Sequence, residues 1–231
     1  MSSKKSGLSS IGRKVLMALT GFFLMFFLLQ HLTINLMSVF SPDLFNEVSH
    51  FFGTNFLIQY MLQPVLIFSV VFHFAWGLYL EYQNTQAREV KYAKYKGSAN
   101  ASWMSRNMLI SGLAVLAFLA LHFYDFWIPE INTKYFHGDM SGMLHDGEGM
   151  RYHIELVEKF AHQPMRVALY VGAFIMLSLH LLHGFQSAFQ SVGFNNTKYT
   201  PIIKMLGNLF AILVPLGFLF IAIYHYNVHP H

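Results

Sequence analysis

The sequence contains no cysteine among its 231 residues. This absence excludes disulfide bonds, a haem held by a thiolate, and an iron–sulfur cluster held by cysteines of this chain alone. It also excludes a covalent c-type haem, which requires a Cys-x-x-Cys-His run. Charged residues are scarce too, at 11% against about 25% in soluble domains. Because so few charges cannot cover a soluble surface, the composition predicts a membrane protein. The net charge of +4 does not indicate nucleic-acid binding, because the basic residues fall on one side of the predicted membrane.

Five apolar stretches are long enough to cross a bilayer, which takes about 20 mostly apolar residues in a helix. We therefore predict an all-α fold, with residues 1–231 forming a single membrane domain of five transmembrane helices. The predicted spans cover about 15–40, 59–82, 107–127, 165–189 and 203–226. Pro64 and Pro201 fall near span starts, where a missing N–H costs little, whereas Pro215 falls inside the fifth span and predicts a kink. The first stretch is too long for a signal-peptide core, so we expect no cleaved signal.

The basic residues predict the orientation of these spans. Of the 15 lysines and arginines, 11 lie on one side of the membrane: Lys4, Lys5, Arg13, Lys14, Arg88, Lys91, Lys94, Lys96, Arg106, Lys198 and Lys204. The other side carries most of the acidic residues: Asp43, Glu47, Glu130, Asp139, Asp146, Glu148, Glu155 and Glu158. The positive-inside rule then predicts a cytoplasmic N-terminus and an external C-terminus in the cell's inner membrane. Trp127 and Tyr226, near predicted span ends, fit an aromatic belt.

The connections on the acidic side are the longer ones. Residues 41–58 have an amphipathic pattern, with Leu44, Val48, Phe51 and Phe52 among polar neighbours. Residues 128–164 hold a Gly-rich stretch and a short predicted helix around 152–161. This segment is either a solvated loop or a cap over a site near the outer surface.

Histidines stand out in the predicted spans because ionisable side chains inside a membrane are costly and usually functional. His31 and His122 lie about seven and about five residues before the outer ends of their spans. His73 and His180 each lie about nine residues from the inner ends. Four helices thus supply two histidines at each of two depths. That arrangement predicts two bis-histidine haems, although a lone membrane histidine is also explained by an interhelical hydrogen bond.

A weak internal repeat supports the same interpretation. Thr20-Gly21 precedes His31 as Ser111-Gly112 precedes His122, with glycine ten residues before histidine in both. His73 and His180 are each followed four residues later by glycine, at Gly77 and Gly184. A glycine one helical turn from a histidine leaves room for a flat macrocycle, while helix packing through small residues is the alternative explanation.

Other histidines are less suited to a haem. His183 is the main rival to His180, but only His180 matches His73 in the repeat. We expect the remaining ones to be ordinary surface residues: His50, His137, His145, His153, His162 and His225.

At these residues the chain resembles the dihaem cytochrome b membrane anchor of succinate dehydrogenase and fumarate reductase, in its single-subunit, five-helix form. The resemblance rests on four short motifs: Gln30-His31-Leu32, Phe72-His73 with Gly77, Leu121-His122, and His180 with Gly184-Phe185-Gln186-Ser187. It implies two haem b groups, one held by His73 and His180 nearer the cytoplasm and a distal one held by His31 and His122. It also implies a flavoprotein subunit and an iron–sulfur subunit as cytoplasmic partners, with menaquinone or another quinone as substrate in the respiratory chain and the tricarboxylic acid cycle.

Three further residues are weaker candidates. Arg13 and Arg166, at span ends, are either partners of haem propionates or interface anchors. Glu47 is a candidate for the quinone site. The dicarboxylate chemistry itself is expected in a partner rather than in this chain. Two alternatives remain: a cytochrome b subunit of another quinone-linked enzyme, such as a formate dehydrogenase or hydrogenase, and a cofactor-free transporter or proton channel.

Overall fold

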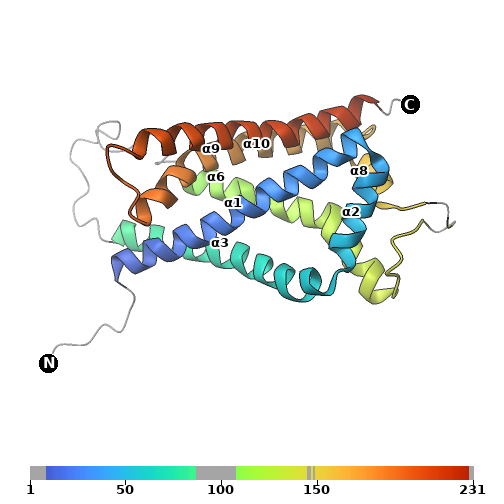
Figure 1. Ribbon diagram of the computed structural model, residues 1–231, viewed down its shortest axis with the longest axis horizontal. Helices are drawn as coiled ribbons and strands as arrows, with labels where there is room; N and C mark the ends of the chain where they lie inside the picture. The colour runs from blue at the N-terminus through green and yellow to red at the C-terminus, as the bar shows by residue number, and fades with distance from the viewer. Residues whose placement is uncertain (1–8, 87–107, 145–146, 148, 229–231) are drawn as a thin grey trace.

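The computed structural model describes residues 9–86, 108–144, 147 and 149–228, and it is helical with no strand in these ranges (Figure 1). Five helices are long and apolar enough to span a membrane: Ser10–Phe40, Ile58–Gln86, Met108–Phe136, Pro164–Ser191 and Thr200–Val228. The predicted five-span, all-α fold is therefore confirmed. The following residues of the sequence argument lie outside the described ranges: Lys4, Lys5, Arg88, Lys91, Lys94, Lys96, Arg106, His145, Asp146 and Glu148.

The spans begin with α1 (Ser10–Phe40), which Ser9 caps by accepting a hydrogen bond from the Gly12 N–H. The second span joins the π-turn η1 (Ile58–Leu62) to α3 (Gln63–Gln86). The third combines α6 (Met108–His122), η2 (Phe123–Trp127), α7 (Ile128–Ile131) and η3 (Asn132–Phe136). The fourth and fifth are α9 (Pro164–Ser191) and α10 (Thr200–Val228).

The third span is longer than the sequence predicts. Helical structure continues from the expected end near Trp127 to Phe136. Trp127 therefore lies inside the helix rather than at its end. The polar residues Glu130 and Lys134 hid this continuation, because they make the segment look like a loop although they pair with each other within the helix at 2.5 Å.

Two π-turns lie directly before prolines. η1 ends two residues before Pro64, and η2 ends two residues before Pro129. Proline has no N–H to donate to the preceding turn, and a π-turn relieves the resulting mismatch without ending the helix. Pro64 thus lies inside the second helix rather than at its start. In the fifth span α10 runs unbroken through the buried Pro215.

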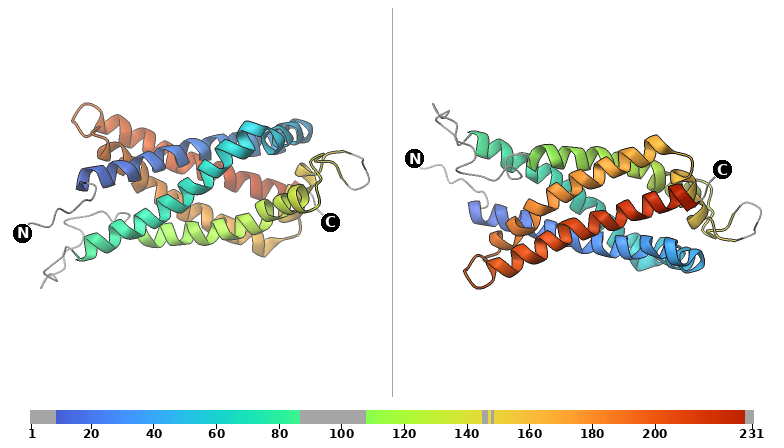
Figure 2. Two further views of the ribbon diagram at one scale, coloured as in Figure 1. Left: turned by 90° about the horizontal axis from the view of Figure 1, so that it is seen from below. Right: turned by 90° about the horizontal axis from the view of Figure 1, so that it is seen from above.

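The helices form one bundle in which neighbours in sequence are mostly neighbours in space (Figure 2). α1 packs against α3, α9 and α10, while α6 packs against α9 and, less extensively, α3. α1, α3, α6 and α9 therefore surround a common centre, and α10 covers the seam between α1 and α9. We call the end where α1 begins the N-terminal end, and the opposite end the capped end.

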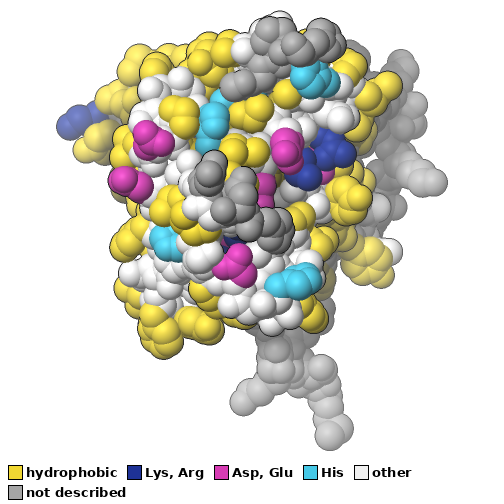
Figure 3. Space-filling view, turned by 90° about the vertical axis from the view of Figure 1, so that its right-hand side faces the viewer, with side chains coloured by type: hydrophobic (Ala, Val, Ile, Leu, Met, Phe, Trp, Pro, Cys, Tyr) yellow, Lys and Arg dark blue, Asp and Glu magenta, His cyan; other side chains and the backbone are white. Residues whose placement is uncertain are grey.

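Two short helices cover the capped end: α2 (Pro42–Thr54) and α8 (Tyr152–Phe160). Figure 3 views this end, where carboxylates and imidazoles lie among apolar side chains. α8 packs against α2, α9 and α10, so part of the 128–164 connection does cap the bundle. The amphipathic segment forms α2, on which Phe45 is buried, Val48 and Phe52 are half-buried, and Leu44 and Phe51 are exposed.

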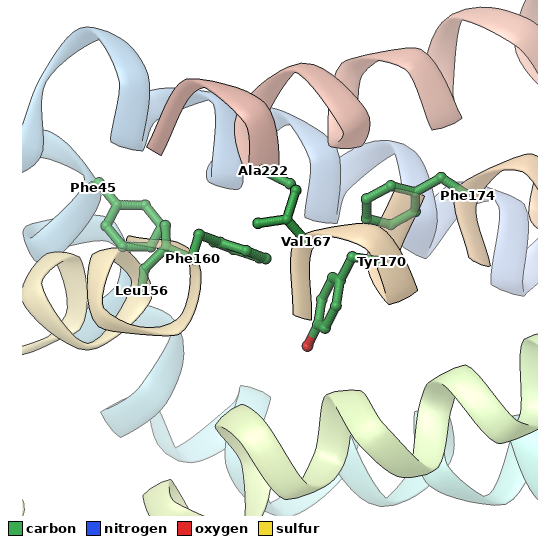
Figure 4. Close-up of a cluster of buried hydrophobic side chains, with 7 residues drawn as sticks. All are labelled: Phe45, Leu156, Phe160, Val167, Tyr170, Phe174 and Ala222. Atoms are coloured by element: carbon green, nitrogen blue, oxygen red, sulfur yellow. The ribbon is translucent and has the colours of Figure 1, made fainter. Parts of the chain in front are cut away.

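A cluster of buried side chains fixes the cap to the bundle: Phe45, Leu156, Phe160, Val167, Tyr170, Phe174 and Ala222 (Figure 4). They come from α2, α8, α9 and α10, so the two cap helices share one core with the fourth and fifth spans. In Figure 4 the Tyr170 hydroxyl points out of this cluster toward the third span.

Candidate functional site

The four span histidines meet two by two inside the bundle. The rings of His73 (α3) and His180 (α9) have centroids 6.4 Å apart with 67° between their planes. The rings of His31 (α1) and His122 (α6) have centroids 5.7 Å apart at 83°. We call His73/His180 the N-side pair and His31/His122 the cap-side pair, from their positions along the helices. His183 lies one turn further along α9, and the ring that faces His73 is that of His180.

In the N-side pair, the Nδ1 atom of each ring lies beside a hydroxyl of the preceding span. Oγ1 of Thr20 is 3.0 Å from Nδ1 of His73, and Oγ of Ser111 is 3.4 Å from Nδ1 of His180. Both contacts join corresponding positions of the internal repeat. With Nδ1 occupied, Nε2 is the nitrogen of each ring that remains for a ligand.

The cap-side pair lies among aromatic rings instead. Phe27 stacks on His31 at 5.3 Å, and Phe118 stacks on His122 at 5.7 Å, each from one turn earlier on the same helix. The Asn35 side-chain amide lies 3.4 Å from both nitrogens of His31. Among the described residues, the buried Nδ1 of His122 has no hydrogen-bond partner.

The donor set suits a haem better than a bare metal ion. A protein zinc site uses three or four side-chain ligands, but among the described residues no three His, Cys, Asp or Glu side chains converge. Two histidines suffice for a haem, because the macrocycle supplies the other iron ligands. Each pair brings two imidazoles from different helices into contact, so each level offers two nitrogen donors to one bound group.

The repeated glycines give a second test of fit. A Cβ added at Gly21 would lie 3.7 Å from Cε1 of His73, and one at Gly112 would lie 3.6 Å from Cε1 of His180. At Gly77 and Gly184 the nearest atom would be a methionine methyl, Cε of Met17 at 3.4 Å and Cε of Met108 at 3.7 Å. These are ordinary contact distances.

Packing requires glycine elsewhere in the bundle. A Cβ at Gly207 or Gly217 of α10 would come within 2.8 Å of Phe185 or Leu32. Close helix packing therefore explains the glycines of α10 but not the four repeated ones, each of which costs roughly 0.5–1 kcal/mol relative to alanine in a helix.

The predicted arginines already have protein partners. The guanidinium of Arg13 donates to Oε1 of Gln83 and to the Ser10 hydroxyl, and its buried Nε has no partner among the described residues. Arg166 forms an ion pair with Asp125. Glu47 is exposed on α2 at the capped end.

His225 corrects the expectation of an ordinary surface residue. Its side chain is 0% exposed, and its Nε2 lies 2.9 Å from the Ser38 hydroxyl. The ring of His153 lies 5.5 Å from that of His225, and His153 Nε2 lies 3.1 Å from the Ser38 carbonyl oxygen. The apolar run of the fifth span does not predict this contact, because His153 lies on α8, which is distant in sequence and packs against α10 only in the folded protein.

Asp125 is a buried carboxylate that the sequence pattern did not single out. Asp125 is 1% exposed, accepts a 2.7 Å hydrogen bond from the Tyr170 hydroxyl, and pairs with Arg166. The Tyr170 ring lies 6.4 Å from that of His122, so this ion pair is close to the cap-side pair. An acidic residue three positions after a span histidine was the available signal.

Comparison with known proteins identifies no relative: no family model, curated protein or solved structure matches the chain.

Proposed function

We propose that this chain is a membrane cytochrome b subunit that binds two b haems and carries electrons between a membrane quinone and a soluble partner. The observation that carries the proposal is the meeting of four histidines as two facing pairs at two levels of the bundle. Interhelical hydrogen bonds between histidines would explain one pair. They do not explain two pairs from repeated halves with four glycines that packing does not require.

The chain's own residues would divide the work as follows. His73 and His180 would hold one haem through Nε2, and His31 and His122 the other. Gly21, Gly77, Gly112 and Gly184 would leave space for the N-side group, while Phe27 and Phe118 hold the cap-side rings in place. Haem iron, when bound, supplies a centre that takes up and releases one electron. Both histidine pairs lie on the long apolar helices that are candidate membrane spans.

The distribution of charge supports the proposed partners. Among the described residues, Arg13, Lys14, Lys198 and Lys204 lie toward the N-terminal end, which by the positive-inside rule would be the cytoplasmic end. A flavoprotein subunit and an iron–sulfur subunit would dock there, as in the succinate dehydrogenase and fumarate reductase anchors that the motifs resemble. Electrons from succinate would then enter at His73/His180.

Menaquinone or another quinone would react near the cap-side pair. Of the carboxylates toward this end, the candidates for the quinone site are Glu47, exposed on α2, and Asp125, buried beside Tyr170 and Arg166. Moving one elementary charge across the whole membrane against its potential costs about 2.3 kcal/mol per 100 mV. Electron transfer between the two histidine levels would move charge across part of that distance. The direction of electron flow would therefore depend on the membrane potential.

The test is to purify the chain with its native partners, identify them by mass spectrometry, and record absorption spectra. We expect a flavoprotein, an iron–sulfur protein and b-type bands that succinate reduces. Partners of formate dehydrogenase or hydrogenase type would instead support another quinone-linked enzyme. Purified chain without a haem band would contradict the proposal and favour a cofactor-free transporter.

A further inference from the structure

Two hydroxyl groups occupy equivalent positions beside the N-side pair. Thr20 lies on α1 and contacts His73 of α3, while Ser111 lies on α6 and contacts His180 of α9. Each hydroxyl thus comes from the first helix of its half of the repeat and reaches the histidine of the second. Each also directly precedes a repeated glycine, so the small residue and the hydroxyl face the same imidazole.

The helix backbone decides which way these hydrogen bonds run. The Thr20 hydroxyl donates to the carbonyl oxygen of Met17 at 3.0 Å, and the Ser111 hydroxyl donates to that of Met108 at 3.0 Å. A hydroxyl has one hydrogen and two acceptor lone pairs. With its hydrogen directed at the backbone, the oxygen accepts from the ring, so Nδ1 of His73 and of His180 carries the proton and Nε2 presents a lone pair.

The cap-side pair lacks this arrangement. The Asn35 amide nitrogen beside His31 is a donor, and it donates to the carbonyl oxygen of His31 at 2.8 Å. Within the described part of the chain, Nδ1 of His122 has no acceptor. The two histidine pairs therefore differ in what their second ring nitrogen meets, although their centroid spacings are similar.

We propose that Thr20 and Ser111 are positioning residues that set the reduction potential at the N-side level, an inference that rests on the proposed haem binding. An acceptor at Nδ1–H fixes the tautomer and orientation of a ligating imidazole and raises its basicity. A more basic ligand stabilises the oxidised iron, so both hydroxyls lower the potential of the haem held by His73 and His180. The cap-side haem receives no such contribution.

The test is a spectroscopic redox titration of the purified protein with Thr20→Val, Thr20→Ser, Ser111→Ala and Thr33→Val. Valine keeps the shape of threonine but removes the hydroxyl. We expect Thr20→Val to raise the midpoint potential of the N-side haem and leave the cap-side haem unchanged, and Ser111→Ala to do the same more weakly because its contact is longer. Thr20→Ser should restore the native value. Thr33→Val is the matched control, since the Thr33 hydroxyl lies on the exposed side of α1 and bonds only to the Leu29 carbonyl among the described contacts.

The outcomes separate this inference from the proposed function. A native protein without haem would contradict both. Two haems with an unshifted N-side potential in Thr20→Val and Ser111→Ala would overturn the positioning role alone, as would an equal shift of both haems. If Thr20→Val loses the N-side haem while Thr20→Ser keeps it, the hydroxyl is required at that position, and the Ser111→Ala potential must still rise.

Discussion

Gly112 of α6 lies beside the imidazole of His180 of α9, where an added Cβ would be 3.6 Å from Cε1. A methyl group is tolerated at that distance, but a larger side chain would enter the space next to the ring. We therefore predict that Gly112→Leu and Gly21→Leu abolish the N-side haem and keep the cap-side haem. Haem content and reduced-minus-oxidised spectra measure this.

The glycines of α10 provide the control. Gly207→Ala places a Cβ 2.8 Å from Phe185, so it should destabilise the bundle by about 1–3 kcal/mol through overpacking while both haems remain at full occupancy in the folded protein. If Gly207→Ala removed a haem selectively and Gly112→Leu did not, the role assigned to the repeated glycines would be wrong.

The fourth span offers a choice between two histidines. Because the ring facing His73 is that of His180, His180→Ala should remove one haem, whereas His183→Ala should retain both. The readout is the ratio of haem to protein in each purified variant. If His183→Ala lost a haem and His180→Ala kept both, the haem ligand on α9 would be His183, one helical turn further along.

The Asp125–Arg166 pair predicts a large stability effect. Removing the guanidinium alone, in Arg166→Ala, leaves the fully buried Asp125 carboxylate without its partner and should cost about 3–5 kcal/mol. Replacing both residues by leucine should cost much less, because no uncompensated charge remains. Thermal unfolding in one detergent compares the variants, and equal losses in the single and double variants would argue against a stabilising buried ion pair.

The capped end should weaken in alkali. Burial, with a contribution from the Glu130 carboxylate, raises the pKa of Tyr152 to about 12 from its ordinary value of 10.0. Because the folded state holds the phenol proton more tightly, the resulting stability is complete below pH 10 and is lost as the pH rises toward 12. Thermal melts from pH 9 to pH 12 should show a steeper loss for the native protein than for Tyr152→Phe, and identical slopes would contradict this assignment.

The apolar runs were sufficient to predict the five spans, since a bilayer leaves few alternatives to a long apolar helix. They did not predict the continuation of the third span to Phe136, because this part of the helix contains the charged residues Glu130 and Lys134. These two residues form an ion pair with each other. Glu130 also pairs with Arg151, and Lys134 donates to the carbonyl oxygen of Gly53. Burial of Arg151 would lower the pKa of its guanidinium, but hydrogen bonds to Glu130 and Glu155 raise it above its ordinary value. A local sequence pattern does not show ion pairs between residues that lie far apart in the chain.

For the site, the repeat pointed to the histidine pairs but not to what surrounds them. Gly21 and Gly112 precede His31 and His122 by ten residues, which is about 15 Å along a helix. They therefore lie at the level of the other pair, beside His73 and His180. Thr20 and Ser111 were part of the same motifs, yet their hydrogen bonds depend on how neighbouring helices face each other, which a single sequence does not specify.

The most direct test of the account is the pattern of haem loss in four single variants: His31→Ala, His73→Ala, His122→Ala and His180→Ala. The account predicts two b haems in the native chain. It predicts that His31→Ala and His122→Ala abolish the same spectral component, and that His73→Ala and His180→Ala abolish the other. Native protein with one haem or none, or variants in which His31 and His73 remove the same component, would contradict it.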